Sequence, residues 1–556
     1  MAMFEEAVRI LKDGLGNDIL ECKVPKPRRA YILVKHGCHR DAISLLLKQS
    51  ERTGISTITG TDLGSEIELN YHMRCGGVVT IKNRVPKEKP IIKTITDLLP
   101  GAAFYEREVF DLLGVMFEGH PNLKRLLLPD NWPKGTYPLR KDWKPQDVKS
   151  SVSDYEKTSE TNGGELKEST SIVNVVVGPQ HPALHEPERF SFKVDGEVVV
   201  DVEPRLGYVH RGIEKAAEHL MFFQDVHLVE RVCGICNAAH TTCFSQAVED
   251  IGGIDVPPRA LYLRTIIFEL NRIHSHLLLL GVAGLLVGYE ALFQYVWRDR
   301  EPIMDIIEMI TGNRLMNAFN TIGGVRRDLD PNITGKIKKT LEKVKKRVNF
   351  YKVVFKEDPT LRLRTEGVGV LSKSDALKLC VAGPVLRGSG IDMDVRKDDA
   401  YAAYEEIPFN VISYKECDSW ARLMVRAEEV LESLDIVIYA LEHLPSGRFR
   451  VRVPRRQPEG EAVGRVEAPR GELIHYVKSD GTAYPYRVKI RSPSLANLIS
   501  FPTIIRGGYV ADIPAVLASL DPCFSCTDRM VFLDTQNDRR WYWSLEEIKH
   551  LKKRNR

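Results

Sequence analysis

Two short cysteine pairs, placed far apart, constrain this chain of 556 residues more than any other feature of its sequence. Cys233 and Cys236 form one C-x-x-C pair, and Cys523 and Cys526 form the other. This spacing lets two thiolates of one turn converge on a metal, and soft sulfur ligands favour zinc, nickel or iron–sulfur clusters. The stretch between the pairs far exceeds the ~15–20 residue spacer of a compact zinc ribbon. If the four sulfurs share a metal, the intervening fold must bring the two pairs together.

Composition excludes several other classes of protein. Apolar content of 43% and charged content of 28% are typical of a soluble globular protein, and a net charge of +4 gives no reason to expect a nucleic acid partner. The first residues carry acids where a signal peptide carries bases, and the most apolar run, residues 277–288, is shorter than the ~20 residues of a membrane span. We therefore expect a buried core helix there, in a cytoplasmic protein without a membrane span of its own.

The pattern of apolar residues predicts two domains and a tail. Residues 1–145 predict a small α+β domain, and 146–170 are too polar to bury a core and predict a linker. Residues 171–529 predict a mainly helical domain, and 530–556 form a basic tail. The predicted fold class is therefore α+β: a small N-terminal α+β domain joined to a mainly α-helical domain with small peripheral sheets.

Periodicity places the main elements within these domains. Helices are expected at residues 4–15, 40–49, 258–280, 332–355 and 417–444. Strands are expected at residues 30–34, 55–59, 67–73, 77–82, 172–177, 464–468, 472–478 and 486–490, with a hairpin turn at Asp195-Gly196.

The residues around the cysteines carry a family resemblance. On spacing alone, four thiolates leave open a structural zinc site, an iron–sulfur cluster or a binuclear centre. Arg231-Val-Cys-Gly-Ile-Cys-x-x-x-His240, with Asp521-Pro-Cys-x-x-Cys-Thr-Asp-Arg529, resembles the large subunit of nickel–iron hydrogenases. Gly178-Pro-Gln-His-Pro-Ala and Tyr208-Val-His-Arg-Gly-Ile-Glu-Lys215 are similar to the quinone-site subunit of complex I. Residues 91–143 resemble the 30-kilodalton-type subunit of complex I, a structural neighbour of that subunit.

The combination resembles the group 4 membrane-bound nickel–iron hydrogenases, of the formate hydrogenlyase and hydrogenase-4 type. The resemblance implies that Cys233 and Cys523 are terminal thiolates on nickel. It also implies that Cys236 and Cys526 bridge nickel to an iron that carries carbon monoxide and cyanide. Thiolates neutralise the charge of the metals, and an open position on nickel leaves room for dihydrogen.

The same resemblance gives roles to residues around the metals. Glu214 matches a glutamate that relays protons, although by itself it could be a solvent-facing helix acid. Arg470 matches an arginine above the open metal position, where the alternative is a surface ion pair. Three further residues are expected to orient the ligands by hydrogen bonds, with a purely structural histidine as the alternative for the second: Arg231, His240 and Asp521.

Partners and processing also follow from the resemblance. It implies a small iron–sulfur subunit, a ferredoxin-like iron–sulfur subunit, integral membrane subunits that hold the chain on the cytoplasmic face of the cell membrane, and a maturation endopeptidase. Formate, carbon monoxide and reduced ferredoxin are the alternative electron donors, with formate dehydrogenase or carbon monoxide dehydrogenase as a partner for the first two. The endopeptidase is expected to cut between Arg529 and Met530, just beyond the last cysteine pair.

Two rival functions stay open at this point. One is a complex I-like NADH or ferredoxin:quinone oxidoreductase subunit, which has no need of the four cysteines. The other is an inert scaffold whose thiolates hold zinc, in which the Glu214 and Arg470 motifs are idle.

Overall fold

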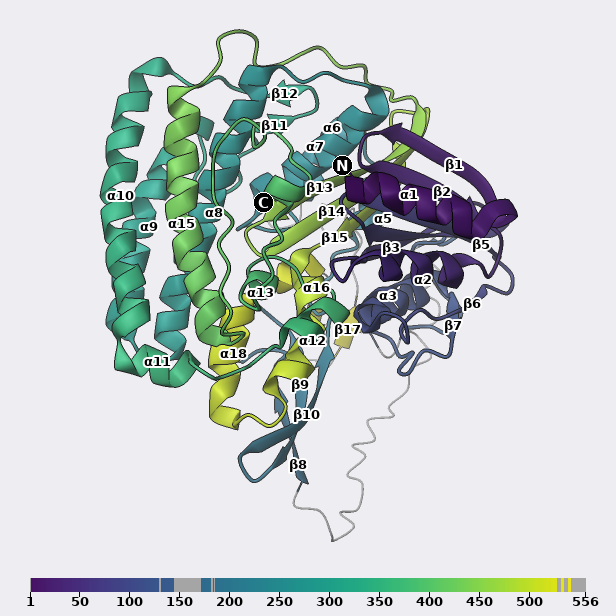
Figure 1. Cartoon of the computed structure of the whole chain (residues 1–556), viewed down its shortest axis with the longest axis horizontal. Coiled ribbons are helices and arrows are strands. Elements are labelled where there is room, and N and C mark those ends of the chain that lie inside the picture. Colours follow the sequence, from purple (N-terminus) through teal and green to yellow (C-terminus); the bar gives the residue numbers. More distant parts are fainter. Residues whose placement is uncertain are drawn as a thin grey trace.

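The computed structural model describes residues 2–129, 132–144, 172–181, 184, 186–527, 532–534 and 539–541. The predicted linker at 146–170 and the predicted cleavage point between Arg529 and Met530 lie outside the described residues. Figure 1 shows an N-terminal part on one side, a bundle of long helices on the other, and a three-stranded sheet between them. The mixture of helices and sheets confirms the predicted α+β class.

The N-terminal part is built on a five-stranded sheet of order β1-β2-β5-β4-β3. β2 and β5 run parallel, whereas the other neighbours are antiparallel. The elements are α1 (Ala2–Leu15), β1 (Ile19–Lys26), β2 (Arg29–Val34), α2 (His39–Gln49), β3 (Gly54–Asp62), β4 (Glu66–Arg74) and β5 (Val78–Pro86). All but β1 match predicted elements. β1 was missed because its side chains are mostly exposed and do not alternate in polarity.

Helix α3 (Ala103–Leu113) buries charged side chains that hold the backbone around it. The Asp111 carboxylate accepts hydrogen bonds from the backbone N–H groups of Leu127 and Leu128, each at 2.8 Å. The Glu106 carboxylate accepts one from the N–H of Ile95 at 2.8 Å. A buried carboxylate must find such donors, so this acidic sequence forms an internal helix. Beside α3 lie two short parallel strands, β6 (Ile91–Lys93) and β7 (Met116–Glu118).

Long helices make up the bundle of the larger part (Figure 1). They are α8 (Pro258–Leu286), α9 (Glu290–Thr311), α10 (Pro331–Glu357) and α15 (Ser419–Glu442). Three of them confirm predicted helices. The starts of α10 and α15 are fixed by side-chain caps: the Asp330 carboxylate accepts from the N–H of Asn332 at 2.9 Å, and that of Asp418 from Ala421 at 2.8 Å.

Helix α8 contains part of the most apolar run and is the only described helix long and apolar enough to be compared with a membrane span. Its most apolar window is 94% buried inside the protein. It therefore behaves as the core helix that the sequence predicts.

Shorter elements complete the larger part. The helices are α5 (Ile213–Ala217), α6 (Phe222–Glu230), α7 (Asn237–Gly252), α11 (Pro359–Thr365), α12 (Lys373–Lys378), α13 (Pro384–Arg387), α14 (Val395–Asp398), α16 (Pro493–Leu498), α17 (Phe501–Ile505) and α18 (Ile513–Leu520). The strands are β8 (Ile172–Val177), β9 (Arg189–Asp195), β10 (Val198–Arg205), β11 (Asn320–Thr321), β12 (Gly324–Val325), β16 (Phe532–Asp534) and β17 (Arg539–Trp541). β9 and β10 form the hairpin predicted at Asp195-Gly196.

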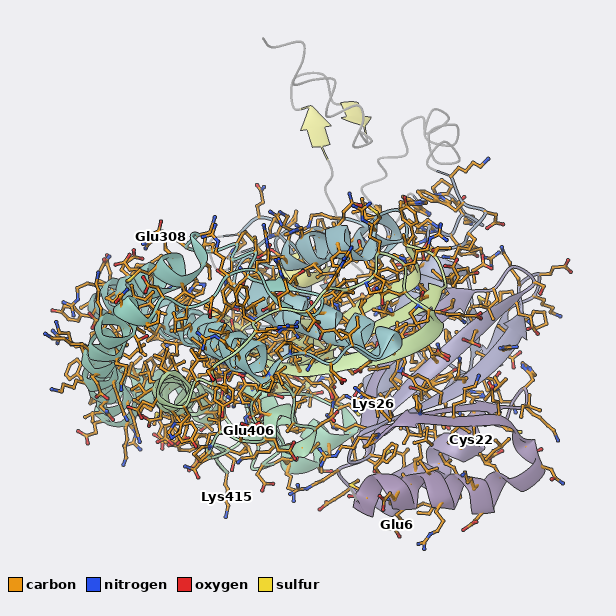
Figure 2. All side chains as sticks on the ribbon, turned by 90° about the horizontal axis from the view of Figure 1, so that it is seen from above. Glu6, Cys22, Lys26, Glu308, Glu406 and Lys415 are labelled. Carbon is orange, nitrogen blue, oxygen red and sulfur yellow. The ribbon has the colours of Figure 1, made fainter. Side chains whose placement is uncertain are left out.

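The sheet of β13 (Glu459–Ala468), β14 (Gly471–Asp480) and β15 (Pro485–Arg491) lies between the two parts. Its position differs from the predicted peripheral one, because nearly all its residues are buried. Arg487 donates to the carbonyl of Gly60 at 3.0 Å, and the Tyr486 hydroxyl to that of Asp62 at 2.7 Å. Charged residues of this sheet are paired across the seam, so its sequence suggests more exposure than it has. In the side-chain view of Figure 2, Lys26, which pairs with Asp250, marks one edge of the seam.

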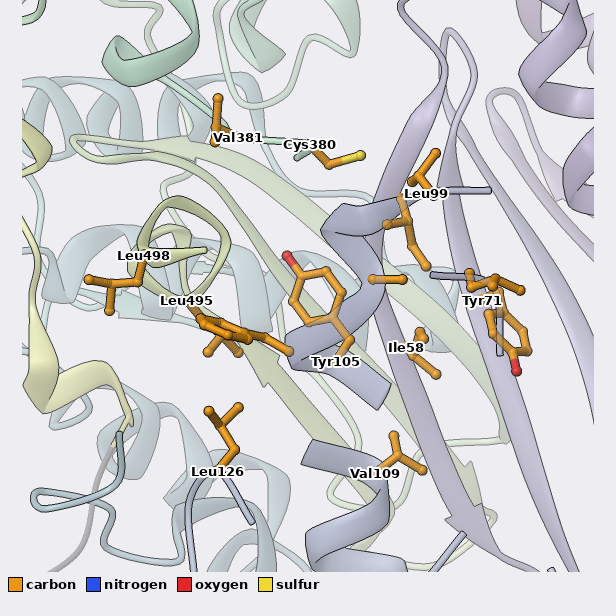
Figure 3. Close-up of a cluster of buried hydrophobic side chains, with 14 of the residues drawn as sticks. Ile58, Tyr71, Leu99, Tyr105, Val109, Leu126, Cys380, Val381, Leu495 and Leu498 are labelled. Atoms are coloured by element: carbon orange, nitrogen blue, oxygen red, sulfur yellow. The ribbon is translucent and has the colours of Figure 1, made fainter. Parts of the chain in front are cut away.

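One hydrophobic core runs across both parts. It joins residues of the N-terminal sheet and α3 to residues near 380 and to α16. Figure 3 shows Tyr105 and Val109 of α3 in one cluster with Cys380, Leu495 and Leu498. The N-terminal part is therefore packed into the larger part as core, and the linker is not what holds the two together.

Candidate metal centre

The fold brings the two cysteine pairs together. The first pair lies in the turn between α6 and α7, and the second follows α18. The Sγ atoms of Cys233 and Cys523 are 3.3 Å apart, and both side chains are buried. Cys236 is equally buried, whereas for Cys526 the structure describes only its place in a 3₁₀ turn, Phe524–Thr527. The convergence expected from the sequence thus holds for one cysteine of each pair.

Backbone groups support a negative charge on Cys233. Its Sγ accepts the N–H groups of Ile235 at 3.3 Å and of Cys236 at 3.4 Å. Helix α7 begins at the next residue, Asn237, so the N-terminal end of its dipole faces the turn. Amide donors and a helix N-terminus both favour a thiolate over a thiol.

Arg470 and Asp521 form a buried ion pair beside the cysteines. Arg470 lies in the turn between β13 and β14; its Nη2 donates to Asp521 Oδ1 at 2.7 Å and its Nε to the Asp521 carbonyl at 2.8 Å. A third donor, Nη1, reaches the Ser275 hydroxyl at 3.3 Å. Burial disfavours the charge, but Asp521 and the thiols of Cys523 and Cys233 raise the pKa of Arg470. The guanidinium is therefore a fixed cation next to the sulfurs.

Three residues that hold the second cysteine turn were not predicted. Arg211 donates to the carbonyls of Val232 and Ser525, at 2.8 and 3.2 Å, and so ties the two cysteine turns to each other. Glu186 accepts the N–H of Ser525 at 2.7 Å, and the Ser494 hydroxyl accepts that of Cys523 at 2.9 Å. Arg211 stands in the same motif as Glu214, and this was the signal available in the sequence.

Two of the residues expected to orient the ligands make other contacts. His240 Nδ1 lies 3.1 Å from His475 Nε2, and burial lowers the pKa of His240 to about 4. The Arg231 side chain is 54% exposed and reaches Glu230 at 3.2 Å and the carbonyl of His227 at 2.8 Å. Among the described contacts, Arg231 takes part in the site only through its carbonyl, which accepts from Arg211.

Glu214 is held in a cationic setting on α5. Its carboxylate receives Arg487 Nη2 at 2.7 Å, the Ile490 N–H at 3.0 Å and Lys489 Nζ at 3.3 Å, and only 12% of its side chain is exposed. Burial alone would raise the pKa of Glu214, but Lys489 and Arg487 lower it to about 2. The solvent-facing alternative does not describe this side chain.

A cavity of about 40 Å³ connects Glu214 to the cysteine turns. It is lined by Glu214, by Val232, which precedes Cys233, and by Ser525, which lies between the cysteines of the second pair. This volume exceeds the ~10–15 Å³ that a single water requires. A proton can therefore travel between the turns and the carboxylate through water.

The donor set fits a soft metal. Two thiolates bound at ~2.3 Å to one metal lie within about 4 Å of each other, as Cys233 and Cys523 do. Within the described part of the chain, no group of three or more histidine, cysteine, aspartate or glutamate side chains is spaced to hold a metal ion. The Cys526 side chain stands outside that part, so the described sulfurs supply only part of the predicted set.

Comparisons with known proteins fit this arrangement. The family described as "Respiratory-chain NADH dehydrogenase, 30 Kd subunit" matches residues 32–149, and "Respiratory-chain NADH dehydrogenase, 49 Kd subunit" matches 287–457 and 454–529. "Nickel-dependent hydrogenase" matches residues 211–280.

The chain is also similar to whole proteins of this kind. It is 38% identical over 468 residues to "Formate hydrogenlyase subunit 5" of Escherichia coli (strain K12), covering 83% of this chain and 81% of that protein. It is 35% identical over 496 residues to a fused subunit of the NADH-quinone oxidoreductase of Phocaeicola vulgatus, covering 85% and 95%. A protein in the solved structure of "the membrane-bound sulfane sulfur reductase (MBS), an archaeal respiratory membrane complex" is 35% identical with a TM-score of 0.62, over 64% of this chain and 98% of that one.

The fold and the matches define a complex I-like large subunit with a second domain fused in front of it. The chain belongs to the family of group 4 hydrogenase and NADH-quinone oxidoreductase large subunits, with a 30-kilodalton-type domain at its N-terminal end. This confirms the family that the cysteine and glutamate motifs predict.

Proposed function

We propose that this chain is the catalytic large subunit of a membrane-associated nickel–iron hydrogenase, which interconverts protons, electrons and dihydrogen. The observation that supports it best is the 3.3 Å approach of Cys233 Sγ and Cys523 Sγ beside the Arg470–Asp521 pair. A quinone site needs no converging thiolates, and a structural zinc site needs neither a buried cation beside its sulfurs nor a carboxylate on a water-sized cavity.

The residues have separate roles in this proposal. Cys233, Cys236, Cys523 and Cys526 would hold a nickel–iron centre, which when bound supplies the open position where dihydrogen is split heterolytically or formed. Arg470 places a positive charge where negative charge develops, and Asp521 keeps its guanidinium in one orientation. Glu214 accepts the released proton, or returns it in the reverse direction.

Partners follow from the family and from the cysteines of this chain. Its remaining cysteines stand singly in the sequence, so electrons would pass through a small iron–sulfur subunit and a ferredoxin-like subunit. Relatives named for membrane-bound complexes support attachment to integral membrane subunits, which we place on the cytoplasmic face. A maturation endopeptidase would cut between Arg529 and Met530; the intact mass of the active enzyme tests this directly.

Metal content is the test of the proposal. The chain is purified from a host with hydrogenase maturation enzymes, and nickel and iron are measured for wild type, Cys523→Ser and Cys243→Ser. Cys243 is the matched control, because it is also buried and bonds only to a backbone carbonyl, Leu473 at 3.6 Å, among its described contacts. We expect about one nickel per chain in wild type and Cys243→Ser, and almost none in Cys523→Ser.

Deuterium exchange between dihydrogen and water then tests the activity. Exchange by the nickel-loaded wild type, lost in Cys523→Ser, supports the hydrogenase. Zinc alone, or no metal, in protein that reduces quinone would support the NADH-quinone relatives instead. A loaded protein without exchange would direct the search to sulfur substrates, as in the name of the MBS relative.

A further inference from the structure

A second buried carboxylate stands beside Glu214, and it comes from the N-terminal part. Lys489 of β15 is an ion-pair partner of Glu108 on α3, and its Nζ also lies 3.3 Å from Glu214 Oε1. One ammonium group thus serves two carboxylates. Tyr105 and Val109, on either side of Glu108 in the sequence, pack in the core shared with α16, which fixes this part of α3 against the larger part (Figure 3).

Glu108 is incompletely satisfied. Its Oε2 is buried and receives no hydrogen bond from any residue in the described ranges, and only 8% of the side chain is exposed. Glu108 lines the same cavity of about 40 Å³ as Glu214, with His210, Ser492 and Ser525. An ionised carboxylate oxygen without a donor is costly to bury, whereas a protonated one, or one bonded to water in this cavity, is not.

The charges around the pair place its proton on Glu108. Burial raises the pKa of Glu108, and the negative charge of Glu214 raises it further, against the effects of Lys489 and Arg487. Those same two cations hold the pKa of Glu214 low. Two neighbouring carboxylates that share too few cations hold one proton between them. His210, at the cavity wall, is the other titratable group facing the pair.

The geometry points to Glu108 as the proton acceptor that follows Glu214, so that the N-terminal domain takes a direct part in proton transfer at the site. This inference rests on the proposed function and deepens it. A proton released at the cysteines forms an O–H bond with Glu214. A cavity water then passes a proton to Glu108 Oε2, and the Glu214 O–H bond breaks. No electrons move in these steps, and the same route runs backwards when protons are reduced.

The test is Glu108→Gln in the assembled enzyme, measured by deuterium exchange across pH together with nickel content. We expect wild-type nickel, exchange slower by about tenfold or more, as for the loss of a general base, and disappearance of the pH dependence that Glu108 causes. The matched control is Glu106→Gln on the same helix, a buried carboxyl that bonds to Thr94 and the Ile95 N–H and does not line the cavity. It should keep the wild-type pH profile. A loaded Glu108→Gln enzyme with the wild-type rate and profile would overturn the inference.

A second variant covers the case in which Glu108→Gln does not fold. Glu108→Asp keeps the charge for Lys489 but withdraws the carboxyl from the cavity, so exchange should slow and its pH dependence should shift. An unchanged rate and profile would contradict the inference.

A third measurement separates failure of this inference from failure of the proposed function. Infrared difference spectra of the purified full chain, recorded across pH without metal, report the C=O stretch of protonated carboxyl groups. A band present in wild type and Glu106→Gln, and lost in Glu108→Gln or moved in Glu108→Asp, supports the pair even if the chain binds no nickel. Spectra unchanged at position 108 contradict the pair whatever the metal content.

Discussion

Two buried glutamates in this protein, Glu269 and Glu108, differ in how many donors surround them. Glu269, on α8, accepts from Arg272 at 3.1 Å, Arg396 at 3.3 Å and the Ser433 hydroxyl at 2.6 Å, and also from a tyrosine hydroxyl. Glu108 has one described donor, Lys489, which it shares with Glu214, and one oxygen with none.

The number of donors decides the protonation state of a buried glutamate. Burial would raise the pKa of Glu269, but Arg272 and Arg396 lower it, so Glu269 remains a fixed charge that joins helices. The pKa of Glu108 stays raised because one shared lysine does not offset burial. Full coordination makes a structural anion, and partial coordination beside a cavity makes a proton carrier.

The largest expected effect comes from removing a donor of Glu269. Arg396→Met leaves Glu269 with fewer donors and also deprives Asp394, which Arg396 contacts at 2.7 Å. Breaking a buried pair from one side costs about 3–5 kcal/mol, and the urea midpoint, followed by circular dichroism, should fall accordingly. Arg396→Lys, which keeps the charge without the fork, should fall less. An unchanged midpoint in Arg396→Met would show that this network is not what stabilises the bundle.

The two regions should respond to pH with opposite signs. Burial would raise the pKa of Asp394, but Arg396 and Arg387 lower it to about 2 from 3.8. Its stabilisation, about 2 kcal/mol by this shift, is present above a pH of about 4 and is lost as pH falls toward 2. Asp394→Asn should therefore be less stable than wild type at neutral pH and approach it in acid.

The raised pKa of Glu108 predicts the reverse for the cavity region. There the native state holds a proton that the unfolded chain releases, so wild type should lose stability relative to Glu108→Gln as pH rises. Urea midpoints of the three proteins across pH check both signs. Parallel curves for the two variants would remove the distinction between the regions.

The smallest effect is expected at an exposed pair that serves as the reference. Arg362 and Glu366 contact each other at 2.8 Å, one helical turn apart, with about half of each side chain exposed. Water already solvates both charges, so Arg362→Ala should give no resolvable shift of the urea midpoint. A large shift there would mean that exposure is a poor guide to the worth of ion pairs in this chain.

The local elements were largely predictable, and their assembly was not. Long amphipathic helices such as α10 and α15 have periodicity and aspartate caps that can be recognised from neighbouring residues. The central place of β13, β14 and β15 depends on partners such as Gly60 for Arg487, which lies more than four hundred residues away. A charged strand suggests exposure until such partners are known.

The site divides in the same way. The meeting of Cys233 and Cys523 was expected from motifs that occur in one order in a family. The role of Arg211 as a tie between turns, and the presence of Glu108 at the cavity, depend on contacts between distant segments. The predicted orienting role of the Arg231 side chain is not supported by its described contacts, because a motif records the residue and not the direction of its side chain.

The core shared by the N-terminal part and α16 has a consequence for biosynthesis. Helix α3 leaves the ribosome roughly 370 residues before β15, which carries Lys489, is made. At ~5–20 residues per second this delay is roughly 20–75 s. During that time Tyr105, Val109 and the carboxyl of Glu108 face water or a chaperone, so the nascent sheet must survive as a half-finished surface.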